Sequence, residues 1–380
     1  MIFELTLAVI AAAWVLAYLL LRYVFRRRSE NISLYPLFLI VRSRGVTGPL
    51  DRLAAAAPRF WDAVSRAATV VGVGLTAFAI YILASNLSTY LFRPETVGPQ
   101  NIVIPLIIGV TIRVEQIPYL LIAFGVVLLT HEGLHGIIAR REGLPVKSAG
   151  IFLVFILPGG FVEPDEESFR KSSPGSRIRV AAVGSFANLA IGVIVVLAML
   201  GLFSQGEGGL MVVQAEEGSR IPVNEVLVSV DGIPVNSYTA RNINITLGES
   251  ITVTGLSGAY TFMVRPEVVG ESLPVGTLIR SLGVSRVDVF IPLRWGGGDP
   301  VAVYNLYKSL SWLQLVSIGV AVFNMLPIHM LDGSIMLRAF LERVGVKRVG
   351  PAVNLATAIC LILLASNIFM TYSFFGFFQL

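Results

Sequence analysis

Two of the three histidines in this 380-residue chain stand four positions apart, in the run His131-Glu132-Gly133-Leu134-His135. In a helix with about 3.6 residues per turn, positions i and i+4 share one face, so both imidazoles can bind the same metal ion. Glu132 lies beside them, where a carboxylate can act as general base toward a metal-bound water. The spacing therefore predicts a metal centre with hydrolytic chemistry.

A catalytic zinc ion needs a third protein ligand besides two histidines. Asp332 is our first choice, because it stands in a Leu-Asp-Gly sequence where a break in the helix lets the carboxylate project. His329, three residues earlier, is a rival ligand, and as a neutral imidazole it can equally be a hydrogen-bond partner of a ligand or an interfacial residue.

The composition is that of a membrane protein, with 55% hydrophobic and 14% charged residues. Ordinary soluble chains are about 25% charged, so a water-soluble globular enzyme and a disordered protein are both excluded. The single cysteine, Cys360, lies in an apolar run, which excludes a disulfide framework and a cysteine-built zinc site. The net charge of +5 would permit nucleic-acid binding, but its distribution favours basic cytoplasmic loops, so we expect no nucleic-acid partner.

Six apolar runs are long enough to cross a bilayer, which takes about 20 helical residues. They are residues 2–23, 67–91, 117–138, 180–203, 306–327 and 350–375. The third run contains the histidine pair. Ionisable side chains inside an apolar span cost several kcal/mol unless they are paired or coordinated, so this location argues against a chance match.

Residues 148–162 (SAGIFLVFILPGGFV) are too short to span and are broken by Pro158-Gly159-Gly160. We expect a re-entrant or β-hairpin element, and irregular backbone at membrane depth survives only where it lines a protein cavity. An extended substrate could pair with this element by β-addition, which makes Gly159 and Gly160 candidate substrate-binding residues.

Basic residues are concentrated in the loops after the first, third and fifth runs, whereas residues 92–116 carry only Arg93 and Arg113. The positive-inside rule places the basic loops in the cytoplasm and both termini outside. His135 and Asp332 then lie at the same, cytoplasmic, membrane face. The first run has an acidic front and basic residues after it, so we expect a retained anchor and not a cleaved signal.

Residues 204–300 have the composition of a soluble domain, on the extracytoplasmic side by the same argument. Alternating apolar residues predict strands at 210–213, 226–230, 251–256 and 260–264. Asp231-Gly232 predicts a turn.

Three ordered motifs, HEGLH, Gly184-Ser-Phe-Ala-Asn188 and Asn324-Met-Leu-Pro-Ile-His-Met-Leu-Asp-Gly333, resemble those of the site-2 protease family of intramembrane zinc metalloproteases. The resemblance covers about residues 117–340. It implies one Zn²⁺ per chain, held by His131, His135 and Asp332, with Glu132 activating the water.

The same resemblance implies that Asn324 and Asn188 help to hold the scissile peptide, and that the soluble domain is PDZ-like. From its position in a stripe of small residues, Asn188 can instead form an interhelical hydrogen bond. The PDZ-like domain can bind a substrate C-terminus, filter substrates by size, or serve as a plain structural cap.

The sequence thus predicts a polytopic α-helical membrane protein of about six spans, with a re-entrant or hairpin element and an inserted PDZ-like domain. Its predicted parts are an N-terminal anchor region (1–116), the first core half (117–203), the PDZ-like domain (204–300) and the second core half (301–380). We expect an intramembrane endopeptidase of the cell membrane that cleaves single-span membrane proteins. The alternatives are a metalloprotease that acts on lipidated or membrane-proximal tails, with Glu342 as the sole candidate third ligand, and a non-catalytic scaffold or transporter.

Overall fold

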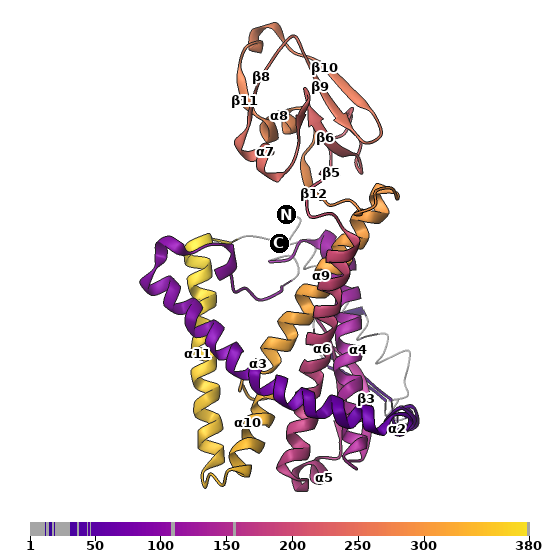
Figure 1. Cartoon of the computed structure of the whole chain (residues 1–380), viewed down its shortest axis with the longest axis vertical. Helices are drawn as coiled ribbons and strands as arrows, with labels where there is room; N and C mark the ends of the chain where they lie inside the picture. The colour runs from indigo at the N-terminus through magenta and orange to yellow at the C-terminus, as the bar shows by residue number, and fades with distance from the viewer. Residues whose placement is uncertain are drawn as a thin grey trace. The chain divides into compact units, whose positions relative to one another are not determined.

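Figure 1 shows the computed structural model of the chain. It describes residues 31–377 apart from residues 36, 37, 44, 46, 108–110, 155 and 156, together with residues 12, 15, 16 and 19. The chain divides into two compact units, one made of residues 1–193 and 312–380 and the other of residues 194–311. The first unit contains the three motifs.

Five helical segments among the described residues are long and apolar enough to cross a membrane. They are α3 (Pro58–Phe92), Val114–Arg141, α6 (Pro174–Leu202), α9 (Pro300–Asn324) and α11 (Val349–Phe375). Five of the six predicted spans are therefore confirmed, and the chain is a multi-span helical membrane protein. The sixth, residues 2–23, lies almost wholly outside the described residues.

The Val114–Arg141 segment contains α4 (Ile117–Arg141), the helix that carries both histidines. α4 begins with Pro118 in its first turn, where the missing N–H costs nothing. It ends because Gly143 adopts a φ of +74°, which allows the N–H groups of Gly143 and Leu144 to close on Arg140 O (3.1 Å) and Ala139 O (2.9 Å). This stop lies two turns beyond His135.

The core of the first unit is built from α3, α4, α6, α9 and α10 (Asp332–Arg343). Small side chains let these helices approach closely. A Cβ on Gly72 of α3 would lie 2.9 Å from the Cβ of Ala182 on α6, so glycine is required at that contact. The buried members include Ala68, Ile138, Ala182, Val183, Ala321, Met325 and Ala339.

The C-terminal half of α3 packs against α11 (Figure 1). A buried amide network joins them: the Nδ2 of Asn86 donates to the Oδ1 of Asn367 (2.8 Å) and to the carbonyl of Asn101 (2.8 Å). The Nδ2 of Asn101 donates back to the Oδ1 of Asn86 (2.6 Å). Since each buried amide is bonded, the network fixes the register of the two helices without an unsatisfied polar group.

The predicted hairpin at residues 148–162 forms β3 (Val146–Val154) and β4 (Leu157–Pro164). It belongs to an antiparallel sheet in the order β1-β2-β3-β4, whose other strands are β1 (Ile32–Tyr35) and β2 (Phe38–Ser43). Gly150 permits the close approach of β2, because a Cβ there would lie 2.2 Å from the Val41 carbonyl oxygen. β4 is the last strand of this sheet and packs along α4.

The second unit contains a sheet in the order β10-β9-β6-β5-β12, with β7 paired to β6. The turn predicted at Asp231-Gly232 joins β6 and β7, with φ values of +46° and +78°. The four predicted strands are confirmed. The strands of this sheet are β5 (Gly209–Gln214), β6 (Val226–Val230), β7 (Ile233–Pro234), β9 (Ser250–Gly255), β10 (Ala259–Met263) and β12 (Arg286–Phe290).

Two short helices and a separate pair of strands also belong to the second unit. They are α7 (Ser237–Asn242), α8 (Val275–Ser281), β8 (Asn244–Thr246) and β11 (Ser272–Pro274). The apolar side chains of the strands and of α8 form one buried cluster, which includes Val212, Leu227, Val253, Val275 and Ile279. The unit is therefore a β-rich domain with its own core, as the composition of residues 204–300 predicts.

Candidate active site

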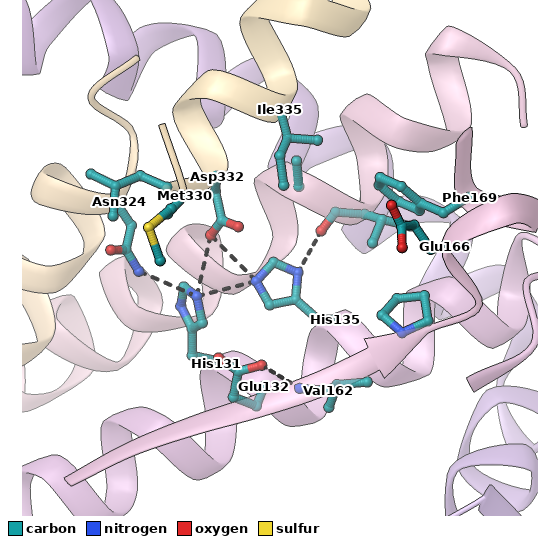
Figure 2. A pocket seen from close by; sticks show the side chains of 14 residues that line it. His131, Glu132, His135, Val162, Glu166, Phe169, Asn324, Met330, Asp332 and Ile335 are labelled. Carbon is teal, nitrogen blue, oxygen red and sulfur yellow. Dashed lines mark hydrogen bonds and ion pairs between the residues drawn. The ribbon is translucent and has the colours of Figure 1, made fainter. Parts of the chain in front are cut away.

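The two α4 histidines point into one site, as their spacing predicts (Figure 2). Their Nε2 atoms are 3.1 Å apart, and His131 is buried. α6 passes directly beside them at Gly184. A Cβ at that position would lie 2.3 Å from His135 Nε2 and 2.7 Å from His131 Cε1, so any side chain larger than hydrogen would fill the space that the ring nitrogens face.

Asp332 joins the histidines from the first residue of α10. Its Oδ2 lies 3.2 Å from His131 Nε2 and 3.3 Å from His135 Nε2. The next residue makes this placement possible. A Cβ on Gly333 would lie 2.3 Å from the Met325 carbonyl oxygen, so only glycine lets α10 begin this close to the end of α9.

The three side chains fit a zinc ion. Their ligand atoms lie 3.1–3.3 Å from one another. A tetrahedral zinc ion with bonds of about 2.0–2.1 Å holds its ligand atoms about 3.3 Å apart. The Oδ2 of Asp332 is also buried and accepts no hydrogen bond from the residues that the structure describes, so a bound cation would compensate the charge of this oxygen. His131, His135 and Asp332 thus form a cluster consistent with one zinc ion per chain.

The outer nitrogen of each imidazole also has a partner. The carbonyl oxygen of Val180 on α6 lies 2.6 Å from His135 Nδ1 and can accept a hydrogen bond from the Nδ1–H group. The fully buried amide of Asn188, also on α6, lies 3.0 Å from His131 Nδ1. Such contacts orient the ring of a metal-binding histidine and direct Nε2 toward the metal.

Glu132 points toward the hairpin. Its Oε2 accepts a hydrogen bond from the Val162 N–H of β4 (2.9 Å). Gly160 on the same strand lies against the glutamate, because a Cβ there would be 2.9 Å from Glu132 Cγ. Gly159 faces elsewhere: its Cβ would lie 2.0 Å from the Phe152 ring across the hairpin. The structure therefore brings Gly160 to the site and places Gly159 in the packing of the hairpin.

The remaining candidates separate clearly. The Nδ2 of Asn324 lies 3.3 Å from His131 Nε2, so this amide lines the site. The Nε2 of His329 lies 2.9 Å from Asn354 Oδ1 on α11, and His329 is exposed and outside the cluster. Glu342, the third ligand of the rival metalloprotease hypothesis, is paired with Arg177 instead. The structure therefore supports Asp332 over both.

These groups line a cavity of about 360 Å³ (Figure 2). Its polar lining side chains are those of the three cluster residues with Glu132, Glu166 and Asn324. The other lining residues are Val162, Pro164, Phe169, Val180, Ala181, Met330, Leu331 and Ile335. The cavity therefore combines an apolar lining with polar groups gathered mainly at the cluster.

Several of these features carry no sequence signal. Val162 and Val180 act through backbone groups, which every residue possesses. The pairing of β2 with β3 is not among the features predicted from the sequence, because residues 38–43 stand in a basic loop, although their apolar run (FLIV) is a strand signal. The role of Gly184 is not predicted either, since a small residue in a spanning helix ordinarily indicates helix packing.

Comparisons with known proteins match the region that contains the site. A family model described as peptidase family M50 matches residues 119–366. An uncharacterised protein of Methanocaldococcus jannaschii is 24% identical over 238 residues, which cover 60% of this chain and 59% of that protein. A protein named as a candidate zinc metalloprotease, from Clostridium perfringens, is 24% identical over 59% of this chain and 86% of its own length.

A membrane-bound transcription factor site-2 protease homologue from Arabidopsis thaliana is 26% identical over 33% of this chain and 26% of its own length. The matched part of this chain thus spans little more than half of the archaeal relative and about a quarter of the plant one. The family model nevertheless covers well over half of the chain and all of the residues that form the cavity. The chain therefore belongs to peptidase family M50, a family of membrane zinc metalloproteases.

Proposed function

We propose that this protein is an intramembrane zinc endopeptidase, which hydrolyses a peptide bond within or near the membrane-spanning segment of single-span membrane proteins. One observation carries the proposal: Asp332, at the start of α10, meets His131 and His135 with ligand atoms 3.1–3.3 Å apart. Both histidines and Glu132 lie on α4, which is apolar and long enough to span the bilayer. Donor atoms of this kind and separation suit a catalytic zinc ion that keeps one position for water or substrate.

The ligands in this proposal are His131, His135 and Asp332. When bound, zinc supplies Lewis acidity, which acidifies water and polarises a carbonyl group. On the side of each imidazole opposite Nε2, Val180 O contacts His135 Nδ1 and the Asn188 amide contacts His131 Nδ1. A metal-binding imidazole needs an acceptor for its Nδ1 proton. The Oδ1 of Asn188, which has no hydrogen-bond partner within the described part of the chain, supplies this acceptor once the amide group is flipped. Asn188 is then a positioning residue for His131.

Glu132 is the general base. It takes a proton from the attacking water and passes it to the leaving amine, which is the ordinary role of a carboxylate in this position. The hydrogen bond from Val162 N–H engages Oε2 and leaves Oε1 to handle the proton. Gly160 supplies the space that the side chain of Glu132 occupies.

Asn324 is the proposed substrate-orienting amide. Its Nδ2 lies beside His131 Nε2, and Figure 2 shows Asn324 and Asp332 next to the same imidazole. From this position the amide can donate a hydrogen bond to the carbonyl oxygen of the scissile bond. Preorganised donors of this kind stabilise the charge that develops on that oxygen.

Substrate backbone is proposed to pair with β4. This strand is the last of its sheet, and its Val162 N–H faces away from β3 toward Glu132. A peptide bond held in a helix has its carbonyl engaged in a hydrogen bond, so the substrate must unwind locally and becomes available for β-addition.

The orientation and the second unit complete the proposal. The positive-inside rule favours a site near the cytoplasmic face of the cell membrane, with residues 204–300 outside. We keep the PDZ-like assignment of that stretch, and a substrate C-terminus as its partner, as predictions from the resemblance. The division of the chain into four parts, with boundaries at residues 116, 203 and 300, also remains a prediction.

The decisive test measures zinc content and cleavage of a model single-span substrate on the same preparations. Wild type should bind one zinc and cleave, whereas Glu132→Gln should keep zinc and lose at least about 100-fold in rate, since general-base catalysis contributes about 10²–10⁴-fold. Glu167→Gln is the matched control, because Glu167 is exposed and forms an ion pair with Lys171 on the surface of α5 (Glu166–Lys171).

Two further variants assign the third ligand. Asp332→Ala should lose zinc and activity together, while His329→Ala should retain both. If Asp332→Ala kept stoichiometric zinc, or if Glu132→Gln cleaved at the wild-type rate, the proposed function would be wrong.

A further inference from the structure

Met330 has an unusual backbone conformation at the edge of the site. It lies in the loop between α9 and α10, and its φ is +74°. Among the described residues, the other non-glycine residues with positive φ are Asn224 and Asp231. Asn and Asp tolerate this conformation because their short polar side chains bond locally, whereas a methionine pays a steric cost.

The surrounding structure holds this strained conformation in place. Pro327 O accepts from the Thr357 hydroxyl (3.0 Å), and His329 Nε2 meets Asn354 Oδ1 (2.9 Å), so α11 grips the loop just before Met330. On the other side, Leu331 N donates to Ile328 O (3.0 Å). A strained backbone conformation that surrounding contacts enforce in this way is typical of functional sites.

The chain gains no packing from Met330 in return. The residue is 98% exposed, although it is large and apolar. It nevertheless lines the cavity, and Figure 2 shows its side chain beside Asn324 and Asp332. A bound ligand would explain this arrangement, because it would supply the packing partner that the Met330 side chain lacks in the protein.

We propose that Met330 is a specificity-determining residue, which contacts an apolar substrate side chain next to the scissile bond. This inference rests on the proposed function. The unbranched, polarisable methionine side chain adapts to apolar partners of different shapes. Val162, Phe169 and Ile335 line the same cavity, so the substrate side chain would enter an apolar environment next to the zinc ligands.

The kinetic test compares two model substrates that differ only in a leucine or a serine beside the scissile bond. Wild type should favour leucine in kcat/KM. Met330→Ala should reduce this preference about 10-fold, the usual size of a lost apolar contact, without loss of zinc. Met330→Leu should restore it. The matched control is Val344→Ala, at the far end of α10, where an exposed apolar side chain lies outside the cavity.

A second measurement does not depend on turnover. The chain's one native cysteine, Cys360, is buried, so Met330→Cys adds the accessible thiol. In the Glu132→Gln background, an added thiol oxidant such as diamide, which takes up the two electrons and two protons of the thiols, should join this cysteine in a disulfide to single cysteines placed next to the scissile bond of the substrate. Val344→Cys should not form this disulfide under the same conditions.

The inference is wrong if Met330→Ala keeps the wild-type leucine preference, or if Met330→Cys cross-links no better than Val344→Cys. Equal losses for both substrates without cross-linking would also overturn it, because they indicate a structural role for the loop. Failure of the proposed function is a different result: wild type itself would show no cleavage that depends on zinc and Glu132.

Discussion

At the scale of single residues, the site depends on groups that are small as much as on groups that react. Gly184 is the clearest case, because its missing side chain leaves the histidine nitrogens open. Gly160 likewise leaves room for the side chain of Glu132, and Gly333 lets α10 begin close to the Met325 carbonyl group. The side chains of the site are therefore positioned by close backbone approach of α6, β4 and the start of α10.

This argument makes Gly184→Ala a damaging change, although alanine is the better helix former. The added Cβ would lie 2.3 Å from His135 Nε2, so α6 or the imidazole must move. We expect zinc affinity to fall at least about 10-fold, comparable with the loss of a group that orients a ligand. Equilibrium zinc titration measures this.

Gly201→Ala is the matched control. Gly201 lies on the same helix, and nothing stands within 4 Å of the Cβ it would gain. This variant should bind zinc like wild type. If Gly184→Ala and Gly201→Ala had the same affinity, the steric account of Gly184 would fail.

At the scale of elements, β4 connects the catalytic helix to the route that we propose for substrate. It packs along α4, bonds Glu132 through Val162 N–H and ends the four-stranded sheet. A strand in that position offers hydrogen bonds to every second residue of a paired peptide, because alternate residues of a β strand face opposite edges.

β-Addition therefore predicts a period of two in a proline scan of the substrate. Proline lacks the N–H, so prolines placed one by one beside the scissile bond should inhibit cleavage at alternate positions. The measurement is the cleavage rate of each variant. A substrate bound as a helix would give no such alternation, and a smooth profile would therefore contradict pairing with β4.

At the scale of the whole molecule, the metal cluster joins stretches of chain that the second unit separates. His131 and His135 precede residues 194–311, and Asp332 follows them. A bound ion would therefore fasten α4 to the start of α10. A metal ion that binds the folded state but not the unfolded state stabilises the folded protein by about 4 kcal/mol when the free metal concentration is 1,000 times the Kd.

Chelation should accordingly lower the melting temperature of the detergent-solubilised protein and abolish cleavage, and added zinc should restore both. The thermal shift on chelation is the measurement. Asp332→Ala provides the control, since a protein without the third ligand should melt at the same temperature with or without chelator. A wild type indifferent to chelation would contradict a metal at this cluster.

The sequence by itself determined the catalytic pattern, five of the spans, the hairpin and the β-rich unit. These features follow from local spacing: i and i+4 share a helix face, alternation marks strands, and apolar length marks spans. His131, Glu132 and His135 could be named for this reason before any tertiary contact was known. The amides Asn188 and Asn324 came from the resemblance, and both lie beside His131.

Only the tertiary structure shows that Asp332, and not His329, lies beside the two histidines, that Gly160, and not Gly159, lies against Glu132, and which groups contact the histidine rings. Two residues only three or fewer positions apart in the sequence are equally able to reach a nearby site, so the sequence does not show which of them does. The contacts that each one makes with distant helices decide this, as the contact of His329 with Asn354 on α11 does. Backbone donors and acceptors such as Val162 N–H and Val180 O are identical in every residue, so no sequence pattern marks them. The positive φ of Met330 likewise occurs in a loop that hydrogen bonds from α11 hold, and these contacts are tertiary.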